Sequence, residues 1–129
     1  MRFTLEQAQV RCRHWQGVLR LQDWDVDVKF GRRWEMHSRN SVAQVWVSDT
    51  TRTATITLLD VVDFKPDISE RESDMDDSIV HELLHLHFHD LRVRKAQGDE
   101  PLTEAEIAEE RAVDALSAAL VALARRVSQ

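Results

Sequence analysis

The N-terminal part of the chain changes from a helical to an extended pattern of apolar residues. Residues 4–19 carry apolar side chains at helical spacing, which predicts a helix with one buried stripe. The members of that stripe are Leu5, Ala8, Cys12, Trp15 and Leu19. Thr4 and Gln7 have the spacing of a capping box at its start. Residues 24–30 alternate strictly between apolar and polar side chains, which predicts a half-buried strand with its apolar residues facing the core.

Two further strands are predicted after an irregular polar stretch. Residues 42–48 and 53–59 are rich in β-branched side chains, which favour strands. The short link between them, 49–52, has the composition of a turn. The two strands are therefore predicted to form an antiparallel hairpin.

The C-terminal half predicts two helices. The first covers residues 75–90, and the acidic residues at its start interact favourably with the exposed amides and the helix dipole. The second begins after Thr103 as N-cap and runs to about residue 126. Its predicted buried stripe consists of Ile107, Val113, Leu116, Leu120 and Leu123. Residues 60–73 and 91–101 are charged, contain the two prolines, and predict connections.

Length and composition narrow the class of protein. A chain of 129 residues fits a single domain, which we expect to span residues 1–129 as an α+β fold. With 43% hydrophobic and 31% charged residues, it has the composition of a globular protein. The formal net charge of −6 argues against a large nonspecific contact with nucleic acid. Cys12 is the single cysteine, so no internal disulfide can form, and it is predicted to be a small buried side chain. No stretch resembles a signal peptide or a transmembrane helix, so we expect no membrane contact and a cytoplasmic location.

The residues with the clearest chemistry are His81, Glu82 and His85, which form an H-E-x-x-H motif inside the helix predicted at 75–90. Residues four apart lie on one face of a helix, so both imidazoles can bind a single zinc ion. Glu82 is placed to act as general base towards a zinc-bound water. The uninterrupted apolar run around the motif favours the helix that this chemistry needs. The sequence therefore predicts one zinc ion, and the alternative is a histidine-rich helix without a metal.

A catalytic zinc site normally has three protein ligands, so a third ligand is expected. Glu110 lies three residues from both Ile107 and Val113, on a face of the final helix that is otherwise apolar. A carboxylate on such a face needs a partner, and zinc is one. Glu109 is the competing candidate, and helix geometry favours Glu110. Asp114, one turn further on, is predicted to accept the other ring N–H of a ligating histidine.

Two more histidines continue the motif helix. His87 is two residues from His85 and points to another side. His89 lies on the line of His81 and His85, but about 12 Å from His81 along the axis, too far to share one ion directly. We expect neither to be a ligand. Both are candidates for a role beside the substrate or for stabilising a developing oxyanion, and His89 is the better one.

The motif at 81–85, followed by Glu110 and Asp114 on a downstream helix, resembles the gluzincin zinc peptidases. Their pattern is H-E-x-x-H, then a glutamate ligand with an aspartate four residues later. The length and order of elements are most similar to the minimal forms, which are minigluzincins, SprT-like peptidases and small H-E-x-x-H proteins of phages and mobile elements. The resemblance implies a zincin-like fold with an N-terminal helix, a small three-stranded and largely antiparallel sheet, the motif helix, and a C-terminal helix that carries the third ligand.

The same resemblance implies a site and a mode of binding. Zinc would be held by His81, His85 and Glu110, and Glu82 would be the general base. Asp114 would accept a hydrogen bond from one of the ligating histidines. A peptide or protein substrate would lie extended along a sheet edge, and the strands at 42–48 and 53–59 are the candidates. Larger gluzincins place a tyrosine or histidine at the oxyanion. This chain has no tyrosine, so a histidine or arginine would have to serve.

The hypothesis is therefore a zinc metallopeptidase that cleaves internal peptide bonds. One alternative keeps the zinc in a zincin fold that binds or regulates a partner without turnover. Another is a nucleic-acid-associated peptidase similar to the SprT group, against which the acidic charge balance counts. The pattern of residues leaves the substrate, the cleavage preference and the oligomeric state open.

Overall fold

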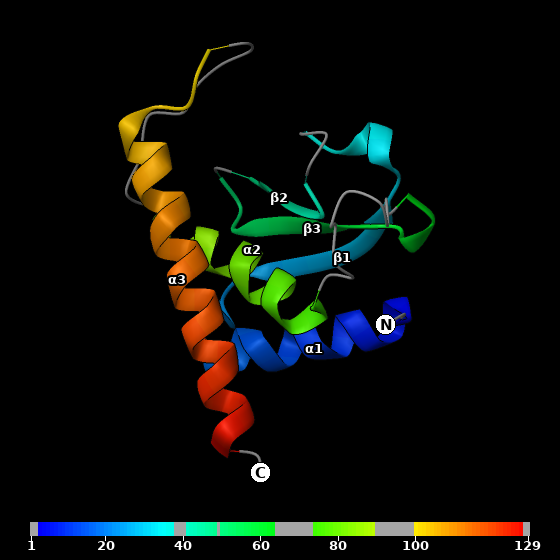
Figure 1. Cartoon of the computed structure of the whole chain (residues 1–129). Helices are drawn as coiled ribbons and strands as arrows, with labels where there is room; N and C mark the ends of the chain where they lie inside the picture. Colours follow the sequence, from blue (N-terminus) through cyan, green and yellow to red (C-terminus); the bar gives the residue numbers. More distant parts are fainter. Residues whose placement is uncertain (1–2, 38–40, 49, 64–73, 90–99, 128–129) are drawn as a thin grey trace.

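The computed structural model describes residues 3–37, 41–48, 50–63, 74–89 and 100–127. Its main elements follow one another as α1 (Leu5–Val18), β1 (Asp25–Gly31), β2 (Ala43–Val47), β3 (Thr53–Leu59), α2 (Met75–His89) and α3 (Glu104–Val127) (Figure 1). The 3-10 helices η1 (Arg33–Glu35) and η2 (Val61–Asp63) follow β1 and β3. The fold is α+β, as predicted, and each predicted helix and strand is present with nearly the predicted ends. The connections predicted at 60–73 and 91–101 lie mostly outside the described residues. Within the described part of the chain, none of the helices is long and apolar enough to cross a membrane.

The three strands form a mixed sheet in the order β1-β3-β2. β2 and β3 pair antiparallel, as the predicted hairpin requires, with Val45 opposite Ile56. β1 pairs with β3 in parallel, with Val28 opposite Ile56. The expectation of a largely antiparallel sheet is therefore wrong. The chain reverses direction into β2 and again into β3, so β3 runs the same way as β1, and β3, the most deeply buried strand, takes the centre.

The helices cover one face of this sheet. α1 packs over β1, α2 packs over β2, and α3 packs on α2 (Figure 1). The alternating apolar residues of the strands meet the helices in one cluster, in which Trp15, Ile56, Ile79 and Leu83 are almost fully buried. Cys12 belongs to the same cluster, as predicted, and burial raises the pKa of its thiol to about 11. This thiol is therefore protonated at neutral pH and belongs to the packing.

α3 is rotated differently from its predicted orientation. Ile107, Leu116 and Leu123 were expected in the buried stripe, and the structure exposes all three. Val113 is buried as expected, and Leu120 is partly buried. The buried residues instead recur every four positions as Glu109, Val113, Ser117 and Val121. This row lies against α2, where Glu109 pairs with His85, and that polar contact accompanies the rotation.

Polar contacts at the start of α2 join it to both neighbouring helices. Asp76 Oδ1 accepts hydrogen bonds from Arg11 Nε at 2.8 Å and from Trp15 Nε1 at 2.9 Å, both on α1. Asp74 Oδ2 lies 2.7 Å from Arg125 Nη1 near the end of α3, and the hydrogen bond from Arg125 lowers the pKa of Asp74. The acidic residues predicted to favour the start of this helix therefore also link it to α1 and α3.

Two glycines provide a matched test of the packing. A Cβ atom on Gly31 would lie 2.5 Å from Thr57 Cγ2 and 2.9 Å from Glu35 Oε2, whereas one on Gly17 in α1 would meet nothing within 4 Å. Thr57 is buried and stiff at its branched Cβ, so Gly31→Ala is expected to lower the free energy of unfolding by about 1–3 kcal/mol through overpacking. Gly17→Ala is expected to raise it by about 0.5–1 kcal/mol through helix propensity. Urea unfolding followed by circular dichroism measures both, and a Gly31→Ala protein as stable as wild type would contradict the close contact.

Candidate metal centre

α2 places the two histidines of the motif side by side. The helix continues without interruption through His81 and His85, and the apolar residues around them point into the core. The imidazole rings lie with their centroids 5.2 Å apart on the side of α2 that faces α3. Their side chains keep only 21% and 14% of their exposure. The four-residue spacing therefore gives a shared, partly shielded face, as the motif predicts.

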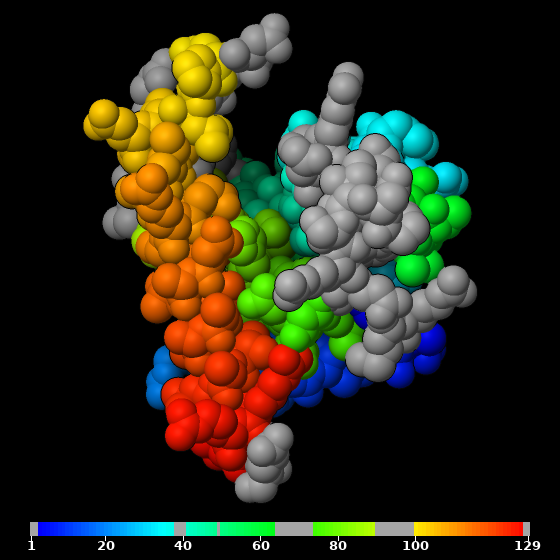
Figure 2. Space-filling view, in the orientation of Figure 1, coloured from blue at the N-terminus to red at the C-terminus, as the bar shows by residue number. Residues whose placement is uncertain are grey.

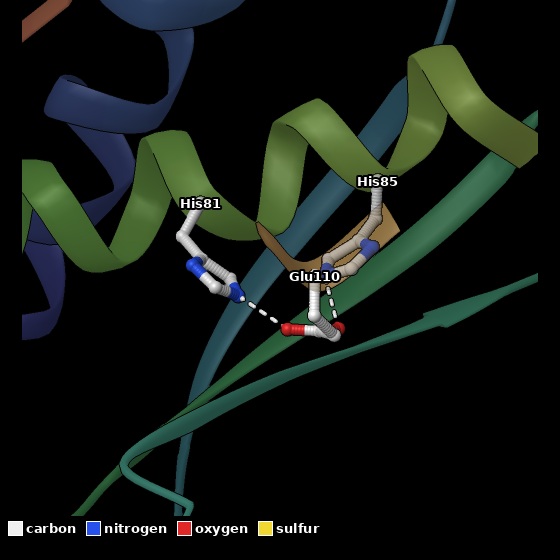
Figure 3. Close-up of side chains that lie close together, drawn as sticks. All are labelled: His81, His85 and Glu110. Carbon is white, nitrogen blue, oxygen red and sulfur yellow. Dashed lines mark ion pairs between the residues drawn. The ribbon is translucent and has the colours of Figure 1, made fainter. Parts of the chain in front are cut away.

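Glu110 reaches this face from α3. Its Oε2 lies 3.5 Å from His81 Nε2, and its Oε1 lies 3.0 Å from His85 Nε2 (Figure 3). One donor atom from each of the three residues lies within 4.8 Å of the others, and these residues form the group able to hold a metal ion in the described part of the chain. The Glu110 side chain is 47% exposed. The surface is hollowed between the N-terminal half of α3 and the strands, with α2 at its floor (Figure 2).

The other nitrogen of each ring faces a second carboxylate. His81 Nδ1 lies 3.1 Å from Asp114 Oδ1, and His85 Nδ1 lies 2.6 Å from Glu109 Oε2. A carboxylate beside Nδ1 holds the ring proton there and leaves the lone pair of Nε2 directed at the cluster. Asp114 thus lies where the sequence reasoning placed it, beside a ring nitrogen of one of the histidines.

Glu109 has a position that the sequence reasoning missed. It was weighed as a rival ligand, but the structure buries it behind His85, on the side of the ring opposite Glu110. The signal was the row of Glu109, Val113, Ser117 and Val121, which repeats every four residues and has only small or β-branched side chains after the glutamate. Such a row allows close packing on another helix and buries its first member.

Glu82 lies beside the cluster, within the core. Its carboxylate is almost fully buried, and Oε2 lies 3.9 Å from His81 Nε2. Burial, together with the negative charges of Glu110 and Asp114, raises the pKa of Glu82 to about 8, and burial is the largest of these causes. A nearby cation would oppose this shift. The carboxyl group is therefore held where it can exchange a proton near neutral pH.

His87 and His89 lie away from the group of donor atoms. His87 Nε2 is 2.8 Å from the carbonyl oxygen of Leu19, which caps the end of α1. The ring of His89 packs edge-on against Trp24, with the centroids 6.1 Å apart. Neither residue is part of the group formed by His81, His85 and Glu110. Their role at an oxyanion stays a prediction.

The donor set fits a zinc ion. Two imidazole nitrogens and one carboxylate oxygen are the ligand types that catalytic zinc sites use, with a further position left for water or substrate. Both ring tautomers are supported by carboxylates, which is the usual outer arrangement of such sites. His81, His85 and Glu110 would hold the ion, and Glu82 lies next to them without being one of the three.

Comparison with known proteins leaves the chain without an assigned relative. No protein-family model matches the sequence, and neither the curated proteins nor the solved structures show a significant match.

Proposed function

We propose that this chain is a zinc-dependent hydrolase that cleaves peptide bonds. The observation that carries the proposal is the convergence of His81, His85 and Glu110 from two helices, with their donor atoms within 4.8 Å. Glu82, a buried carboxyl group with a raised pKa, lies beside them. The metal-dependent part of the proposal is supported by this geometry. The choice of the peptide bond as substrate is supported by the resemblance to gluzincins.

Each group at the centre has a separate role in the proposed reaction. A bound zinc ion supplies a Lewis acid that polarises a carbonyl and lowers the pKa of water towards 7. Asp114 and Glu109 keep the protons of His81 and His85 on Nδ1. Glu82 takes a proton at its carboxylate from the attacking water and gives it to the departing amine. Burial of Glu82 among apolar residues strengthens its charge interactions with the reacting groups.

The sheet offers one edge for an extended substrate near this centre. Of the two candidate strands, β3 is paired on both sides and has no free edge. β2 is an edge strand and packs beside α2, which carries the histidines. We therefore assign the substrate to the edge of β2, where its main-chain groups can pair with an extended peptide.

The test measures zinc content and hydrolysis together. Purified protein is analysed for bound metal, and cleavage of casein and of mixed peptides is compared between wild type and Glu82→Gln. The variant keeps the shape of the side chain and removes its basicity, so we expect a loss of about 10²–10⁴-fold in rate with zinc retained. Glu104→Gln, at the exposed start of α3, is the matched control and should leave the rate unchanged.

Three other results would contradict or change the proposed function. Protein that takes up no zinc would remove the basis of the proposal. Equal cleavage by wild type and Glu82→Gln would show that this carboxylate is not the base. Zinc bound tightly by a protein that cleaves nothing would favour the alternative of a zinc-containing binding module.

A further inference from the structure

One side of α3, between the exposed Arg111 and the buried row that packs on α2, carries only small or apolar side chains in the middle of the helix. α3 runs along the side of the molecule and packs on α2 (Figure 1). Between residues 112 and 123 the only charged residue is Asp114. Leu116 and Leu123 are 43% and 56% exposed. The outer face of α3, as we name it, consists of Ala108, Ala112, Ala115, Leu116, Ala119 and Leu123.

This outer face is separate from the candidate metal centre. Successive residues of a helix are rotated by about 100° around its axis, so Leu116 lies about 200° from Asp114. Glu110 and Asp114 point towards the histidines of α2. A partner on the outer face of α3 therefore leaves the metal centre open.

Charges of opposite sign lie at the two ends of the outer face. Glu104 is exposed in the first turn of α3, and Arg126 is exposed in the last. The two residues lie within about 40° of each other around the helix axis. A second α3 placed antiparallel brings Glu104 of each copy to Arg126 of the other. A parallel arrangement would instead place like charges together.

The sizes of the side chains favour the same arrangement. An antiparallel pair that matches Glu104 with Arg126 has its two-fold axis close to Ala115. Leu116 then lies near its own copy at the centre of the contact. Leu123 of each copy lies opposite Ala105 and Ala108 of the other, where small side chains leave room for it. Small residues at a helix contact also permit a short distance between the axes.

We propose that two copies of this chain pair through the outer faces of α3, antiparallel and around a two-fold axis. The contact is self-complementary, because the same surface serves both copies. It covers apolar side chains that the single chain leaves exposed. The pairing of Glu104 with Arg126 at each end sets the orientation.

Sedimentation equilibrium of the full chain tests the pairing. The wild type is expected to be dimeric at concentrations around 0.1 mM. Leu116→Glu places two like charges at the centre of the contact and is expected to weaken the dimer at least about thirtyfold, the size of an interface hot spot. Val10→Glu, at an apolar position of α1 that is 55% exposed, is the control and should leave the dimer intact. Thermal unfolding checks that both variants fold.

Charge exchange tests the orientation. Glu104→Arg and Arg126→Glu, made singly, are each expected to weaken the dimer about threefold to tenfold, and the double variant should restore it. A wild type that is monomeric, or a dimer that Leu116→Glu leaves intact, would overturn the proposal. A double variant that shows the sum of the two losses would overturn the antiparallel register.

Discussion

Glu110→Ala is expected to abolish tight zinc binding while the fold is retained. The substitution removes one of three donor groups that lie within 4.8 Å, and Glu110 is half-exposed, so little packing is lost. The remaining two histidines cannot complete the three protein ligands of a catalytic zinc site. Competition with a coloured zinc chelator measures the affinity, and circular dichroism measures the fold. Zinc should raise the unfolding temperature of wild type and leave that of the variant unchanged.

Glu109→Gln provides the matched comparison one residue earlier on the same helix. Glu109 lies behind His85 and contacts Nδ1, so the amide weakens the hydrogen bond to the ring and leaves all three candidate ligands in place. We expect a zinc affinity about 10–100-fold below that of wild type, which is the usual effect of changing a group that hydrogen-bonds to a metal ligand. This loss is smaller than the one expected for Glu110→Ala. A larger loss of zinc affinity for Glu109→Gln than for Glu110→Ala would show that Glu109, and not Glu110, is the third ligand. Glu104→Ala, in the exposed first turn, should leave the affinity unchanged.

Leu83→Ala is expected to lower the free energy of unfolding by about 2–5 kcal/mol, because it leaves a cavity in the core. Leu83 is fully buried within the motif, between His81 and His85 in sequence and on the opposite side of α2 from them. A loss of this size is a large part of the stability of a chain of this length. Urea unfolding of the zinc-free protein measures it without any contribution from metal binding.

Leu102→Ala is the control for this core substitution. Leu102 precedes α3 and is 55% exposed, so its replacement should change the stability by less than about 0.5 kcal/mol. Equal losses for Leu83→Ala and Leu102→Ala would show that α2 does not bury its apolar side as described. Zinc affinity of the Leu83→Ala protein, measured well below its unfolding temperature, would then show how strongly the ligand geometry depends on this packing.

The local features were predictable from the sequence because each rests on neighbouring residues. The helix from Leu5 to Val18 begins with the predicted capping box, in which Thr4 and Gln7 bond to one another's main chain. The strand Thr53–Leu59 follows from its β-branched residues and the turn before it. The spacing of His81 and His85 places both rings on one side of α2, since a helix repeats its direction after about four residues.

Features that depend on contacts between distant segments were decided only by the tertiary structure. The order of the strands places the most deeply buried strand, β3, between the other two. The alternation of side chains along a single strand does not reveal which strand is central. The rotation of α3 was mispredicted from its large apolar residues, because a row with Glu109 and Ser117 packs on α2 and leaves Leu116 and Leu123 exposed. That rotation directs Glu110 to the Nε2 atoms and Glu109 to Nδ1 of His85. The sequence by itself determined the elements and the histidine pair, and the packing of α3 on α2 decided which carboxylate meets which nitrogen, because a contact between helices depends on both surfaces at once.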